Sequence, residues 1–134
     1  MNLIFREIYR QPTTLVTMDI PQAVEERHGT PFGDDPTLRK VDGPATVIRR
    51  EHVVVPAASQ GPLADAKVYL LTSKNTFSAA EHLSLSLKRT GRATLVGETT
   101  GGGAHFGGMV PMGKGFAAFI PVGRTFDPTT GQSW

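Results

Sequence analysis

The fold class of this chain is decided at residues 67–103, which read KVYLLTSKNTFSAAEHLSLSLKRTGRATLVGETTGGG. The short apolar run at 68–71 predicts a strand that is covered on both faces. An amphipathic pattern predicts a helix over 79–90, and a further apolar run predicts a strand over 93–96. Two strands joined by a helix form a parallel βαβ unit under the right-handed crossover rule. The sequence therefore predicts an α/β fold.

The predicted helix begins after a serine. Ser78 precedes it and Glu81 follows three residues later, which is the spacing of a capping box. Ala80, Leu83 and Leu87 fall on one face of the helix, so we expect that face to pack on the sheet.

Ser78 has two interpretations. Backbone N–H groups point outward at a helix start and favour negative charge, so a hydroxyl there can be a nucleophile whose attack creates an oxyanion. The N–H of Ala79 would then be an oxyanion donor. A serine at a helix start is also an ordinary capping residue, worth about 1 kcal/mol of helix stability. The local pattern favours the cap and leaves the nucleophile open.

A glycine-rich loop follows the second predicted strand, with glycines from Gly97 to Gly108. His105 lies in this loop, where it is either a general base or a solvated residue. Glu98 opens the loop, where it either orients His105 or is solvated. Ser78, His105 and Glu98 are therefore the candidate catalytic residues.

Composition argues against several function classes. The chain has 134 residues and a formal net charge of +2, and its basic residues are scattered, which argues against nucleic-acid binding. No apolar run approaches the length of a membrane span. The chain has no cysteine, and its four histidines lack zinc-site spacing, so we expect no metal and no cofactor. His82, on the predicted helix, is expected at the surface.

The rest of the chain is less sharply patterned. Residues 1–66 contain seven prolines and are expected to form a loop-rich segment of uncertain fold. Short elements are expected within it at 3–9, 14–18, 47–48 and 53–55. The first of these would be a helix with one apolar face made of Leu3, Ile4, Ile8 and Tyr9. Residues 67–134 are expected to form part of an α/β core that ends in a β-hairpin of 109–111 and 116–121.

Several motifs of the C-terminal half carry a family resemblance. They are LTSKNTFSAAE at 71–81, GRATLVGETTGGGAH at 91–105, FIPVGR at 119–124 and DPTTGQSW at 127–134. Together they resemble the tail-specific (carboxy-terminal processing) serine protease family. The most similar branch includes the interphotoreceptor retinoid-binding protein modules and the tricorn-like proteases. The resemblance covers about half of the chain.

The resemblance implies a spiral ββα core of the Clp protease/crotonase type, here incomplete, with short β-hairpins at the C-terminal end. It places Ser78 at the nucleophile position and gives Ala79 one oxyanion N–H. The family's second oxyanion donor comes from a glycine-rich segment upstream that these residues do not include. Where the processing proteases carry a catalytic lysine, this chain has Gly103. The base is therefore expected to be His105 or a histidine outside these residues.

Two functions follow from these expectations. The first is a serine-type peptidase that cleaves a peptide or protein substrate through an acyl-enzyme on Ser78. The alternative is a non-catalytic module that binds a hydrophobic ligand or peptide, similar to the retinoid-binding repeats. The family resemblance implies a location outside the cytoplasm. The chain ends at Trp134 without a polar tail, and we expect it to be a fragment whose own activity is reduced or lost.

Overall fold

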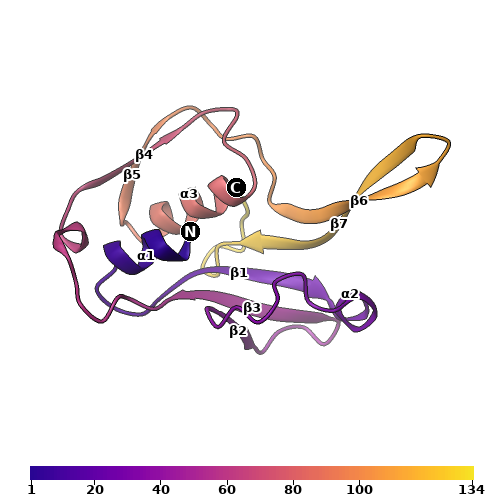
Figure 1. Cartoon of the computed structure of the whole chain (residues 1–134), viewed down its shortest axis with the longest axis horizontal. Coiled ribbons are helices and arrows are strands. Elements are labelled where there is room, and N and C mark those ends of the chain that lie inside the picture. Colours follow the sequence, from indigo (N-terminus) through magenta and orange to yellow (C-terminus); the bar gives the residue numbers. More distant parts are fainter.

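The structure is a computed structural model that describes all 134 residues, and it has an α/β fold in which helix α3 lies between two sheets (Figure 1). A five-stranded antiparallel sheet has the strand order β2-β3-β1-β7-β6, and β4 and β5 form a separate two-stranded sheet. None of the helices combines the length and apolar character needed to cross a membrane. The elements are α1 Asn2–Ile8, β1 Thr13–Pro21, α2 Gln22–His28, β2 Leu38–Val41, β3 Val47–Val54, the 3-10 helix η1 Pro62–Ala64, β4 Val68–Thr72, α3 Ala79–Arg89, β5 Ala93–Gly97, β6 His105–Gly113 and β7 Phe116–Phe126.

The predicted βαβ unit is confirmed. Strands β4 and β5 pair in parallel, from Val68 opposite Ala93 onward, and α3 connects them. The expectation that the first strand is covered on both faces is wrong, because Tyr69 and Leu71 are 63% and 77% exposed. Successive side chains of a strand point to opposite faces, and α3 covers only the face that carries Val68 and its alternate residues.

Helix α1 forms where a helix was predicted, but its buried face differs from the predicted one. Leu3 and Ile4 are 78% and 50% exposed, whereas Phe5 is 1% exposed. The spacing i, i+3, i+4 places Phe5, Ile8 and Tyr9 on the same side of the helix. These three side chains join the apolar core with Leu15, Val54 and Leu87.

The N-terminal segment contains more regular structure than expected. The two short strands predicted at 47–48 and 53–55 are a single strand, β3, because the charged residues between them are paired. Arg49 donates to both carboxylate oxygens of Asp19 on β1, at 2.7 and 2.8 Å. Asp19 is also opposite Arg124 of β7 in the sheet register, so residues 1–66 and 67–134 contribute strands to one sheet.

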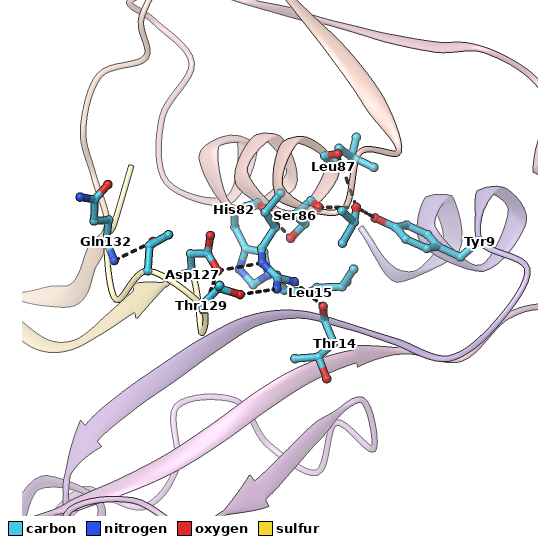
Figure 2. Close-up of polar contacts among 12 residues, drawn as sticks. Tyr9, Thr14, Leu15, His82, Ser86, Leu87, Asp127, Thr129 and Gln132 are labelled. Atoms are coloured by element: carbon cyan, nitrogen blue, oxygen red, sulfur yellow. Dashed lines mark hydrogen bonds and ion pairs between the residues drawn. The ribbon is translucent and has the colours of Figure 1, made fainter.

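Arg89, the last residue of α3, links the helix to β1 and to the C-terminal turn, and Figure 2 labels its partners Thr14, Leu15 and Asp127. Its guanidinium donates to the backbone oxygens of Thr14 and Leu15, at 2.6 and 3.1 Å, and to the Asp127 carboxylate at 3.0 Å. The β1–β3 register shifts between Thr14 and Val16, so Arg89 supplies donors where the strand ladder is irregular.

The hairpin of β6 and β7 extends beyond the body of the molecule (Figure 1). Both strands are longer than predicted, and β6 begins at His105, so Gly107 and Gly108 belong to a strand and not to the glycine-rich loop. A Cβ on Gly107 would collide with the Ile120 carbonyl of β7, so only glycine allows the two strands to approach this closely.

Replacing Leu87 by alanine should destabilise the protein by about 3 kcal/mol, because it leaves a cavity in the apolar core. Leu87 is 2% exposed and packs with both α1 and β1. Urea unfolding measures the change, and Leu63→Ala is the control because Leu63 is 54% exposed. Equal unfolding midpoints for the two variants would contradict the described core.

Candidate active site

The backbone at Ser78 is strained. Its φ of 54° and ψ of −114° lie in a region that residues with a side chain rarely adopt, at a cost of about 1–3 kcal/mol. Ser78 and Lys114 are the only non-glycine residues with positive φ. Ser78 lies on the turn between β4 and α3 and is exposed. The α/β-hydrolases display a nucleophilic serine on a sharp, strained strand-to-helix turn, although their G-x-S-x-G motif is absent here.

Glu81 holds this turn and the glycine-rich loop together. Its carboxylate is fully buried and accepts the backbone N–H groups of Ser78 at 2.7 Å, Gly102 at 2.6 Å and Gly103 at 2.8 Å. Burial alone would raise the pKa of Glu81, but these bonds and one from Thr100 outweigh it, so the pKa is lowered. An ionised carboxylate therefore connects the candidate nucleophile to the loop.

The predicted capping box is present, but its two halves differ. The Ser78 N–H donates to the Glu81 carboxylate at 2.7 Å. The Glu81 N–H faces the Ser78 hydroxyl but donates to the Ser78 carbonyl at 2.9 Å, so the hydroxyl forms no capping hydrogen bond. The hydroxyl therefore has no fixed partner. The N–H of Ala79, the first of the helix, has no partner among the hydrogen bonds of the turn. Both groups remain available to a ligand.

Ser78 lines two neighbouring cavities. One is also lined by Ala79 and His82. The other is lined by Gly103 and His105, so the structure brings Ser78 and His105 to the same cavity. His105 itself is exposed at the start of β6.

The structure places Glu98 apart from this pair. Its carboxylate accepts the Lys74 N–H at 3.3 Å. It lines a third cavity, together with Lys88 and Asp127, and that cavity includes neither Ser78 nor His105. Ser78 therefore shares one cavity with Ala79 and another with His105, and Glu98 lines neither of them.

The glycine-rich loop packs against the ring of Phe77. A Cβ on Gly103 would lie 2.5 Å from the ring Cζ, and a Cβ on Gly101 would lie 2.8 Å from Cδ2. Contacts this short force a neighbour to move. The position at which the resemblance expected a lysine therefore has no space for a side chain unless the Phe77 ring moves.

His82 is buried, which corrects the expectation that it lies at the surface. It is 8% exposed, and its Nε2 lies 2.8 Å from Nδ1 of His52, which is 3% exposed. Burial lowers the pKa of His52 to about 4; burial, His52 and the N-terminal ammonium lower the pKa of His82 to about 3. Both rings are neutral at pH 7. The pairing joins residues 30 positions apart, and no local pattern signals it.

No group of three or more His, Asp or Glu side chains is arranged to hold a metal ion. The candidate site is therefore an exposed serine on a strained strand-to-helix turn, held against a glycine-rich loop by Glu81. The model of one protein family, Peptidase family S41, matches residues 18–133. This match covers most of the chain, so the protein belongs to peptidase family S41, which confirms the family predicted from the sequence motifs.

Replacing Glu81 by glutamine should lower the stability at pH 7 by about 2 kcal/mol, because an amide cannot accept all of the buried N–H donors as a carboxylate does. The folded-state pKa of Glu81 is lowered, so its contribution is fully present above its unfolded pKa of about 4.3 and is lost as pH falls through the folded value. Urea unfolding from pH 7 to pH 3 should therefore show the wild type converging on the variant. Glu7→Gln, at an exposed site, is the control.

The buried histidine pair should make the protein less stable in weak acid. Unfolded histidines take up protons below about pH 6.5, whereas the folded pair stays neutral until pH approaches 4, so stability should fall by up to about 1.4 kcal/mol per pH unit for each histidine. His82→Gln should reduce this slope by half. His28→Gln, at an exposed position, should leave it unchanged, and equal slopes for all three proteins would contradict the pair's burial.

Proposed function

We propose that this protein is a serine peptidase whose nucleophile is Ser78. The observation that carries the proposal is the strained backbone of Ser78, combined with a hydroxyl that forms no capping hydrogen bond. A capping role does not require strain, because a capping serine ordinarily has an extended, unstrained backbone. Membership of a peptidase family supplies the reaction class.

The proposed reaction proceeds through an acyl-enzyme. Ser78 Oγ bonds to the carbonyl carbon of the substrate while His105 takes the hydroxyl proton. The negative oxygen that forms accepts the free Ala79 N–H. The carbon–nitrogen bond then breaks, and His105 gives the proton to the departing amine. Water adds to the ester carbonyl in the same way, which releases a carboxylic acid and restores the Ser78 hydroxyl.

His105 is a better candidate base than His82. A general base works best when its pKa lies near the working pH, and the pKa of His82 is about 3. His82 is also hydrogen-bonded to His52, whereas His105 is exposed and lines the smaller of the two cavities beside Ser78. Glu98 as a partner of His105 stays a prediction, since its carboxylate contacts the Lys74 N–H.

Slow turnover is expected, because these residues supply one oxyanion donor and lack the family's second. Loss of one oxyanion donor typically costs about 10²–10³ in rate, and Ala79 supplies one such donor here.

We also propose that β4, α3 and β5 are part of a spiral ββα core of the Clp protease/crotonase type. The packing of this unit against a second sheet supports that proposal.

A fluorophosphonate probe tests the nucleophile directly. An activated serine oxygen bonds to its phosphorus and fluoride leaves, and no particular substrate side chain is needed. The wild type should be labelled at Ser78, and Ser78→Ala should not be labelled. Ser59→Ala is the matched control, since Ser59 is exposed and away from the site. His105→Ala should slow labelling by about 10²–10⁴. Mass spectrometry of the intact and digested protein measures all four.

Equal labelling of the wild type and Ser78→Ala would exclude Ser78 as the nucleophile. Labelling that survives His105→Ala unchanged would exclude His105 as the base. If no serine reacts, the binding module becomes the better account of the site.

A further inference from the structure

The larger cavity beside Ser78 is lined by no Asp, Glu, Lys or Arg side chain. Its volume is about 410 Å³, within the range of sites that hold a small ligand. The charged group in its wall is the N-terminal ammonium of Met1. Its apolar walls include Met18, Phe32 and Phe106, and the two phenylalanine rings meet edge to face with their centroids 5.3 Å apart. Such walls suit an apolar or aromatic group.

Hydrogen bonds from three other elements fix the tautomer of His82 in this wall. The Asn2 amide nitrogen donates to Asp35 Oδ2 and Thr37 Oγ1, each at 3.2 Å. The Asn2 amide oxygen therefore faces His52 Nε2, at 2.8 Å, and this oxygen can only accept. His52 Nε2 must carry the proton of its ring.

A neutral imidazole has one N–H, so Nδ1 of His52 is an acceptor. The 2.8 Å contact between this atom and His82 Nε2 then requires His82 to donate. His82 is itself neutral at pH 7, because its pKa is about 3. With its proton on Nε2, His82 has an unprotonated Nδ1 that can accept a hydrogen bond.

His82 Nδ1 is open to a ligand. It has no hydrogen-bond partner. The side-chain atoms that lack a partner and are also inaccessible to solvent are Gln60 Oε1 and Trp134 Nε1, so His82 Nδ1 keeps some access to solvent. His82 lines the cavity that it shares with Ser78 and also a neighbouring one with His52, which its Nε2 contacts. The cavity shared with Ser78 thus combines apolar walls with a neutral acceptor. Besides Ser78 and His82, its polar side chains are Thr125 and Trp134, and the Trp134 Nε1 is inaccessible to solvent.

We propose that this cavity binds an aromatic side chain that carries a hydrogen-bond donor, the tyrosine or tryptophan of a peptide substrate, with His82 Nδ1 as the acceptor. The proposal rests on the proposed peptidase function, since the carbonyl of that residue would lie at Ser78. Buried Tyr and Trp require a partner for their O–H or N–H, which His82 supplies. A lysine side chain would be buried there without an acidic side chain to pair with its charge.

Peptidyl diphenyl phosphonates test this specificity. In the reaction the Ser78 Oγ–phosphorus bond forms, the phosphorus–phenoxide bond breaks, and phenol leaves with the serine proton. We compare probes that differ only in the side chain next to phosphorus. The tyrosine probe should react about five times faster than the phenylalanine probe, which is the effect of about one hydrogen bond, and about a hundred times faster than the lysine probe.

Two variants separate His82 from the rest of the wall. His82→Gln keeps an amide N–H for His52 but has no acceptor at the Nδ1 position, so the tyrosine-to-phenylalanine ratio should fall to about one. His82→Asn places an amide oxygen near the Nδ1 position and should retain part of the preference. Thr125→Val is the matched control and should keep the ratio. A ratio unchanged in His82→Gln, or a lysine probe as fast as the tyrosine probe, would overturn the proposal.

A binding experiment separates this proposal from the nucleophile. Titrations with p-cresol and toluene, followed by the amide NMR signals of Ala79 and Gly107 in the cavity wall, need no reaction at Ser78. We expect p-cresol to bind about five times more tightly, and the preference to vanish in His82→Gln. If that result holds while no phosphonate reacts, the cavity assignment stands and the nucleophile falls. If Ser78 reacts but p-cresol and toluene bind equally, the cavity assignment falls alone.

Discussion

Three backbone N–H groups, from Ser78, Gly102 and Gly103, converge on the buried carboxylate of Glu81, and the geometry of the candidate site depends on this convergence. A buried charge is tolerated only when hydrogen bonds replace its lost hydration, so the carboxylate requires all of these donors together. These hydrogen bonds have two consequences for the site. It keeps the loop against the turn, and it compensates for the strain in the Ser78 backbone, which would otherwise relax.

Helix α3 carries this arrangement and is attached to the rest of the fold along its length. His82 bonds to His52 of β3, and Thr90, which follows the helix, bonds to Tyr9, at 2.5 Å between the two hydroxyl oxygens. The Ser86 hydroxyl donates to the His82 carbonyl of the same helix at 2.7 Å, so this buried side chain needs no partner outside α3 (Figure 2). Small, internally bonded side chains allow a sheet to approach the helix from each side. Ser78, at the start of the helix, is thereby held relative to both sheets.

What could be predicted from the sequence is what local spacing encodes. The βαβ unit and the pair of Ser78 and Glu81 follow from periodicity and from a three-residue interval. What could not be predicted depends on distant partners. Strand β3 looked interrupted because the ion partner of Arg49 lies 30 residues earlier, and the same separation concealed the burial of His82. Glu98 follows β5 closely, but the direction in which its side chain points is set by a backbone N–H on another loop.

The pairing of β1 with β7 has a consequence for how the chain reaches this fold. Asp19 and Arg124 are 105 residues apart, yet they lie opposite each other in the five-stranded sheet. During synthesis β1 and β3 can pair early, but the other edge of β1 waits for β7 to emerge. An open edge can pair with other chains, and contacts this far apart in sequence form slowly. The interval before β7 arrives is therefore when a nascent copy of this protein is most exposed to aggregation.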